Sequence, residues 1–180
     1  NFGLVKFERN ENLISLANFG ANDTITEIKA DANYSYLKLK VGLNQPLEIL
    51  DEMWISLDTY DANLGESILP SGDTIPDYRS EFSIQLTNYT AYLYVTEAYD
   101  LFGNWHGVSE PEQLYQSTVT DGAPWNLVRL KNNYLYPDVQ YIGDLNVKNA
   151  NQPIESTDAV IIYEDSIVFR IPWSYINFVA

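Results

Sequence analysis

Aromatic side chains in predicted loops are the residues of this sequence best suited to hold a ligand. An exposed Trp or Tyr ring can cover the apolar C–H face of a sugar, while nearby amides and carboxylates bind the hydroxyl groups. Trp105 lies between Gly103 and Gly107, in a stretch too rich in glycine for the centre of a strand. The alternative is that Trp105 folds back over the end of the core. We predict a ligand platform formed by Trp105, Trp125, Tyr99 and Asn104.

A second group of polar residues is a candidate metal site. Calcium prefers oxygen ligands, and four such side chains occur in a short stretch after a predicted strand: Asp58, Asp61, Asn63 and Glu66. The position of Gly65 does not match an EF-hand loop. The alternative is that Asp58 bonds to local backbone and that Asp61 to Asn63 simply forms a turn.

The inventory of reactive side chains argues against catalysis. His106 is the only histidine and the chain has no cysteine, so a triad would depend on this one residue, and no nucleophile elbow is present. Two carboxylates are enough for glycoside hydrolysis, but nothing in the sequence singles out a pair. We therefore expect no enzymatic activity.

Charge and hydropathy limit the partners of the chain. Its 180 residues carry 25 acids and 10 bases, a net charge of −15, whereas nucleic-acid binding needs clustered cations. No apolar run approaches the roughly 20 residues that span a bilayer. We therefore predict a soluble protein that neither binds nucleic acid nor inserts into a membrane. Its 14 tyrosines suit both β-sheets and surfaces that contact sugars or peptides.

Most of the chain alternates between apolar and polar residues, which is typical of half-buried strands. In Tyr34 to Val41 the apolar residues share one face and two lysines share the other, and Met53 to Tyr60 repeats the pattern. Glu81 to Thr87 and Thr90 to Glu97 are joined by the tight link Asn88-Tyr89 and predict a hairpin. A later strand is predicted at Trp125 to Leu130.

These segments predict an all-β fold. We expect a single β-sandwich, either a jelly roll or immunoglobulin-like, with about nine or ten short and mainly antiparallel strands. Two long loops, Asp61 to Ser80 and Tyr99 to Gly122, are the predicted carriers of function. The sequence contains no internal repeat and no linker, so residues 1–180 are predicted to form one domain, and we expect this domain to be a module of a larger protein.

Four short motifs resemble the family-9-like carbohydrate-binding modules and the wider DOMON-like sandwich superfamily. They are Tyr36-Leu37-Lys38-Leu39, Met53 to Thr59, Glu81-Phe82-Ser83-Ile84 and Ile167 to Trp173, in this order along the chain. The resemblance covers Asp31 to Phe178 and concerns structural strands, not ligand residues. In the last motif Pro172 lacks the N–H that would continue a ladder, and Trp173 is predicted to cover one end of the core.

The resemblance implies a non-catalytic module that binds a polysaccharide or oligosaccharide for a larger exported or cell-surface protein. Two alternatives remain open. One is a structural or protein-interaction domain whose tyrosine-rich sheet face packs on other domains of the parent chain. The other is a haem-carrying module, because some DOMON-like relatives ligate haem with a Met and a His. Met53 and His106 are the single residues of these types, and the alternative is an apolar core Met and an exposed loop His.

Overall fold

The computed structural model describes residues 25–46, 52–59, 61–74, 77–87, 89–97, 99, 117–129 and 141–176. Trp105, Asn104 and His106 lie outside these residues. Within them the fold is all-β and sandwich-like, as predicted, and most strand pairs are antiparallel.

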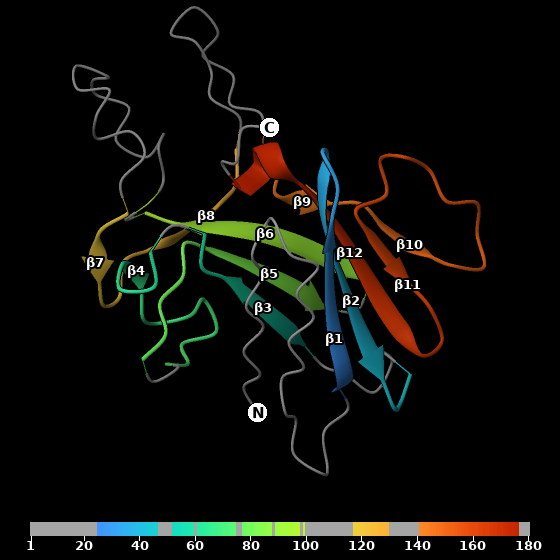
Figure 1. Cartoon of the computed structure of the whole chain (residues 1–180), viewed down its shortest axis with the longest axis horizontal. Coiled ribbons are helices and arrows are strands. Elements are labelled where there is room, and N and C mark those ends of the chain that lie inside the picture. The colour runs from blue at the N-terminus through green and yellow to red at the C-terminus, as the bar shows by residue number, and fades with distance from the viewer. Residues whose placement is uncertain are drawn as a thin grey trace, which may run out of the picture. The chain divides into compact units, whose positions relative to one another are not determined.

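The first five-stranded sheet has the order β1-β2-β12-β11-β10 (Figure 1). Its strands are β1 (Ile25–Ala32), β2 (Tyr36–Leu43), β10 (Val147–Asn149), β11 (Val160–Ile162) and β12 (Ser166–Pro172). Neighbouring strands are antiparallel except β10 and β11, which run parallel. Strand β12, near the end of the sequence, therefore pairs with β2, near its start.

The second five-stranded sheet has the order β3-β5-β6-β8, and β9 pairs with β6. Its strands are β3 (Met53–Leu57), β5 (Phe82–Thr87), β6 (Thr90–Thr96), β8 (Trp125–Leu127) and β9 (Asp144–Leu145). As predicted, β5 and β6 are neighbours joined by a two-residue link. A third, small sheet pairs β4 (Gly65–Glu66) with β7 (Val119–Thr120) in parallel.

Strand β2 illustrates why these segments become half-buried strands. Leu37, Leu39 and Val41 are buried, whereas Lys38 between them is exposed. Burial of such side chains contributes roughly 25 cal/mol for each Å² of apolar surface removed from water. The period-two pattern of the sequence is thus the pattern of burial in the sheet.

The closing tryptophan is a structural residue. Strand β12 ends at Pro172, and Trp173 begins the short 3-10 helix η4 (Trp173–Ile176). The Trp173 indole donates a 2.7 Å hydrogen bond to the carbonyl of Asn33. The Asn33 side chain in turn accepts bonds from the amides of Ser35 and Tyr36, each at 2.8 Å. The predicted covering residue therefore ties η4 to the turn between β1 and β2.

Contact density divides the chain into two compact units, each built from separate stretches of sequence. The first takes in the described residues of Asn1–Met53, Leu86–Ala91 and Leu145–Ala180. The second takes in those of Trp54–Gln85 and Tyr92–Asp144. The single domain expected from the sequence stays a prediction, and the two units are described separately below.

Candidate functional site

The predicted ligand residues fall into different surroundings. Trp105 and Asn104 lie outside the described residues. Tyr99 is buried in the second unit, where its ring and that of Phe82 form a T-shaped pair with centres 5.7 Å apart and planes at 85°. Tyr99 therefore contributes to the core and presents no open ring face to a ligand.

Trp125 is half-buried on strand β8. Its backbone pairs with Thr96 of β6, and its indole N–H donates a 2.9 Å hydrogen bond to the carbonyl of Ile68. Because directly paired residues on neighbouring strands share a face of the sheet, Trp125 lies on the same side as Thr96. Of the two predicted platform tryptophans, it is the one that the structure positions.

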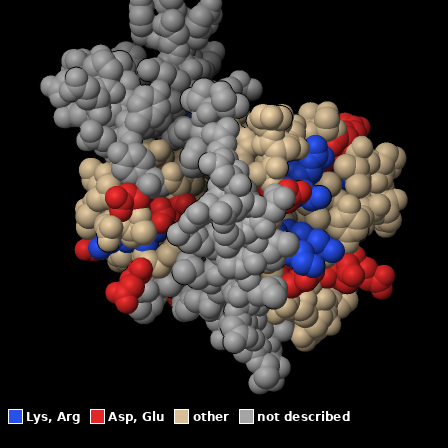
Figure 2. Space-filling view, in the orientation of Figure 1, with Lys and Arg blue, Asp and Glu red and all other residues tan. Residues whose placement is uncertain are grey.

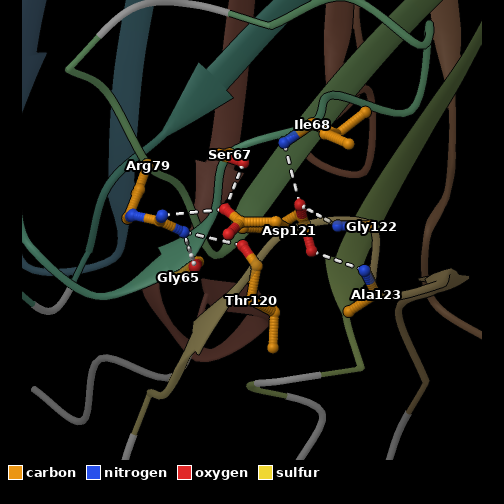
Figure 3. Close-up of polar contacts among 9 residues, drawn as sticks. Gly65, Ser67, Ile68, Arg79, Thr120, Asp121, Gly122 and Ala123 are labelled. Carbon is orange, nitrogen blue, oxygen red and sulfur yellow. Dashed lines mark hydrogen bonds and ion pairs between the residues drawn. The ribbon is translucent and has the colours of Figure 1, made fainter.

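Glu66, a predicted calcium ligand, is fully buried and its carboxylate is already used. One oxygen accepts bonds from the amides of Ile68 (2.8 Å) and Gly122 (2.6 Å), and the other accepts from Ala123 (2.6 Å). Figure 3 shows the amide groups of Ile68, Gly122 and Ala123 arranged around one carboxylate. Burial acts to raise the pKa of Glu66, but these hydrogen bonds outweigh it and hold the pKa below its usual value.

The same region is joined by a guanidinium group. Arg79 donates hydrogen bonds to the carbonyls of Gly65 (3.1 Å) and Thr120 (2.7 Å) and forms a 2.8 Å ion pair with Asp121 (Figure 3). Ser67 donates to the same Asp121 oxygen at 2.7 Å, and this bond and the Arg79 contact lower the pKa of Asp121. The network ties β4 to β7 in the second unit, where each strand is only two residues long.

The remaining predicted metal ligands form a turn. The Asp61 carboxylate accepts bonds from both the backbone and the side-chain amide of Asn63, each at 2.9 Å, and the backbone bond is the main cause of its lowered pKa. Asp58 is exposed. Among the described residues, no three His, Cys, Asp or Glu side chains gather closely enough to hold a metal ion. The four predicted ligands are therefore not brought together as one acidic cluster.

A second fully buried acid, Glu81, was not singled out by its sequence context. Its carboxylate accepts 2.8 Å bonds from the amide of Thr59 and the hydroxyl of Ser117. Burial raises its pKa, and the charge of Asp58 adds to the rise. Burial also raises the pKa of Tyr78 well above its usual range, and its hydroxyl donates to the carbonyl of Ser56. Both groups are held inside the second unit by hydrogen bonds to its backbone.

One face of the second sheet carries a row of aromatic rings, here called the aromatic face. The rings of Trp54 and Tyr94 are centred 6.0 Å apart, and those of Tyr94 and Tyr92 are 6.4 Å apart. The Tyr94 hydroxyl donates to Gln85 at 3.0 Å. Trp125 joins this face through its pairing with Thr96. The buried indole N–H of Trp54 has no hydrogen-bond partner among the described residues.

The first unit contains a groove that the sequence did not reveal. It has a volume of about 530 Å³, within the size range of small-molecule sites. Its lining residues come from four stretches of the chain: Pro46, Tyr89, Asn149, Ala150, Asn151, Ile162, Tyr163 and Glu164. Tyr89 and Tyr163 are 44% and 39% exposed, so part of each side chain is open to solvent. The groove thus combines two accessible tyrosines with amide side chains.

Several polar groups of this groove have no partner among the described residues. Asn149 accepts only the 3.3 Å bond from the backbone amide of Asn151. The amide nitrogen of Asn149, the side chain of Asn151 and the hydroxyl of Tyr163 form no hydrogen bond within the described part of the chain. Glu164 likewise forms neither a hydrogen bond nor an ion pair there. These groups are therefore available to a ligand.

The groove is positioned by tight turns. Tyr89 has φ of 72°, a left-handed conformation that is uncommon for an aromatic residue. The Thr90 hydroxyl closes this turn with a 2.7 Å bond to the carbonyl of Thr87. Tyr163 and Glu164 belong to the turn between β11 and β12, which the Tyr163 amide closes by bonding to Ser166. The sequence signal for this site was the Asn88-Tyr89 link, which predicted the hairpin but not its role.

No family model, no curated protein and no solved structure matches the chain. The described residues contain no helix of the length and hydrophobicity needed to cross a membrane.

Proposed function

We propose that this protein is a non-catalytic carbohydrate-binding module and that the groove of the first unit is its binding site. The observation that carries the proposal is that two solvent-accessible tyrosines, Tyr89 and Tyr163, line one groove together with asparagine side chains whose only hydrogen bond in the described chain is the 3.3 Å bond to Asn149. Tyrosine rings cover the apolar face of a sugar, and amides both donate to and accept from its hydroxyl groups.

The lining of the groove favours a neutral sugar. It includes one acid, Glu164, and no Lys or Arg. A carboxylate accepts hydrogen bonds from hydroxyl groups but repels acidic sugars. The proposal includes an exported or cell-surface location, where a module of this kind would hold its parent protein against a glycan.

A second candidate function is supported by the aromatic face. The rings of Trp54, Tyr92 and Tyr94 are half-buried, so each leaves apolar surface that a partner can cover. A protein partner that packs on Trp54, Tyr92 and Tyr94 would bury the rest of these rings. This candidate makes the chain an interaction domain of its parent protein.

Haem is the third candidate. Met53 is buried at the start of β3, and His106 lies outside the described residues. A Soret absorption band in purified protein would reveal the cofactor directly.

A glycan array tests the proposed function against these rivals. The wild-type chain should bind a subset of neutral glycans, and Tyr163→Ala should lose that binding while keeping its melting temperature. A wild-type chain that binds no glycan, but associates with the rest of its parent protein, would favour the interaction domain instead.

A further inference from the structure

The outward face of the first sheet carries half of the basic residues of an acidic chain. Pairing in register places Lys29 opposite Lys40, and Lys38 opposite Arg170. The register also places Lys148 on this face through the pairs Lys148–Ile161, Ile161–Val168 and Val168–Lys40, although the intervening Ile161 and Val168 are buried. Five of the ten Lys and Arg residues thus share this surface, here called the basic face. Figure 2 shows basic side chains gathered in the region of β1, β2 and β12.

Few acids neutralise the basic face. Glu27 forms a 2.7 Å ion pair with Lys29, and Asp31 lies opposite Lys38 in the register. Lys38, Lys40 and Lys148 form no ion pair with any described residue. Arg170 lies over the ring of Tyr36, 5.2 Å from its centre, and donates to the carbonyl of Glu155 at 3.4 Å. The face therefore keeps an excess of positive charge.

Protection of sheet edges accounts for only part of this pattern. Lysines on edge strands discourage pairing with another chain, and β1 and β10 are the edges of this sheet. That role suits Lys29 and Lys148. It does not suit Lys38, Lys40 and Arg170, which stand on the interior strands β2 and β12.

Stability does not account for the interior cations either. Like charges directly opposite each other in a sheet are destabilising, and the basic face contains two such pairs, Lys29–Lys40 and Lys38–Arg170. The chain has 25 acidic residues, yet each of these two pairs joins two cations. Glu27 and Asp31 offset part of this repulsion at Lys29 and Lys38, and the remaining excess of cations on interior strands is the basis of the proposal that follows.

We propose that the basic face binds a linear, carboxylate-bearing polysaccharide, at a site separate from the neutral-sugar groove. Four of the five cations are lysines, which attract carboxylates as point charges, and the one arginine is already engaged with Tyr36 and Glu155. Strands lie about 4.8 Å apart, and same-face residues on one strand lie roughly 7 Å apart. Lys29, Lys38, Lys40 and Arg170 therefore form a flat array on β1, β2 and β12 that an extended chain of spaced charges can cross, whereas Lys148 lies beyond the buried Val168 and Ile161.

A carboxylated polysaccharide fits this protein better than nucleic acid does. Duplex DNA carries about one charge for every 1.7 Å of its axis, so the net charge of −15 repels it strongly. A polymer with a single carboxylate on each sugar has fewer charges to repel and still meets several lysines. The basic face and the groove are separate sites, so substitutions in one test it without changing the other.

Affinity electrophoresis of the whole chain in gels containing polygalacturonate tests the proposal. The wild-type chain should be retarded at low salt and released at high salt, since exposed charges are screened within about 10 Å at 0.1 M. Lys38→Gln combined with Lys40→Gln should weaken binding by about tenfold or more. The same variant should melt no lower than wild type, because it removes like-charge repulsion.

Matched controls separate a local site from overall charge. Thr74→Glu combined with Thr118→Glu makes the same change in net charge at exposed positions of the second unit. This control should bind polygalacturonate like wild type, and the groove variant Tyr163→Ala should too. The proposal is overturned if wild type is not retarded, if the lysine variant binds unchanged, or if the charge control loses as much affinity. Tighter binding to single-stranded DNA or to polyglutamate than to polygalacturonate would also overturn it.

Discussion

The carboxylate of Glu66 accepts a 2.6 Å hydrogen bond from the amide of Gly122, a residue 56 positions further along the chain. The other carboxylate oxygen of Glu66 accepts a hydrogen bond from the amide of Ala123, and the first oxygen also accepts one from the amide of Ile68. These bonds join the segment after β4 to the segment that leads into Trp125, whose indole bonds back to Ile68. Glu66 thus holds both Ile68 and the segment that leads into Trp125, the two parts of the chain that the Trp125–Ile68 hydrogen bond joins.

Glu66→Gln should destabilise the protein by about 2 kcal/mol, because hydrogen bonds to a charged group are worth about 1.5–3 kcal/mol and a glutamine NH₂ would face the Ala123 amide. Denaturant unfolding at pH 7 measures the loss. The pKa of Glu66 is lowered in the folded state, so its contribution is present above the unfolded pKa and is lost as pH falls through the folded pKa. A variant as stable as wild type at pH 7 would refute this role.

Glu81→Gln should change the free energy of unfolding in the opposite direction and stabilise the protein at pH 7. A glutamine can accept from the Thr59 amide and donate to the Ser117 hydroxyl, so both contacts survive without a buried charge. The pKa of Glu81 is raised in the folded state, so its stabilisation is complete below the unfolded value near 4.5 and is lost as pH rises through the folded pKa.

The advantage of Glu81→Gln over wild type should therefore be absent in acid and should grow as pH rises above 4.5. Thermal melts over a pH series check this, with Glu66→Gln as the matched comparison of the other sign. A Glu81→Gln variant that melts well below wild type at pH 7 would mean that the charge itself is needed.

Gly143 occupies a position with no room for a side chain. A Cβ there would collide with the carbonyl of Leu93 and lie 2.8 Å from the amide nitrogen of Val128. Gly143→Ala should cost about 3 kcal/mol, at the upper end for overpacking, since backbone atoms cannot rotate away. Gly72→Ala is the control: its φ is +88° and nothing lies within 4 Å of the added atom, so only about 1 kcal/mol of backbone strain is expected. Equal losses in denaturant unfolding would contradict the steric argument.

The strand pattern could be predicted because it follows from burial on one face. The buried Leu37, Leu39 and Val41 and the exposed Lys38 stand where the alternation placed them. The residue at which β8 ends could not be predicted from the sequence, because it depends on contacts with distant residues. This strand stops at Leu127, short of the predicted Leu130, where Gly143 bonds to Leu93 and Val128. The small parallel pair β4–β7 also depends on long-range partners, Glu66 and Arg79, and leaves no periodic signal.

The groove of the first unit could not be predicted, for a similar reason. Loops of aromatic and glycine residues drew attention to Trp105 and Tyr99, whereas Tyr99 is buried and Trp105 lies outside the described residues. The groove tyrosines stand in short turns whose sequences look ordinary. Tyr89 lies between β5 and β6 and Tyr163 between β11 and β12, so residues far apart in the sequence line one groove. The four predicted calcium residues are not gathered into one acidic cluster, and the carboxylate of Glu66 is bonded to backbone amides.

Tyr89→Gly should separate stability from binding. The left-handed backbone at Tyr89 costs an aromatic residue about 1 kcal/mol that glycine does not pay, and Asn-Gly is a favoured hairpin link. The variant should melt at or above the wild-type temperature and yet bind glycan about tenfold more weakly, a loss of about 1.4 kcal/mol. Unchanged glycan affinity would remove Tyr89 from the site.

Isothermal titration of the best neutral glycan from the array into Tyr163→Ala and Tyr34→Ala tests the central claim most directly. Both changes remove an exposed tyrosine from the first unit, but Tyr34 is 91% exposed and does not line the groove. We predict that Tyr163→Ala weakens binding by about tenfold or more while Tyr34→Ala binds like wild type. Equal affinities for wild type, Tyr163→Ala and Tyr34→Ala would contradict the groove as the carbohydrate site.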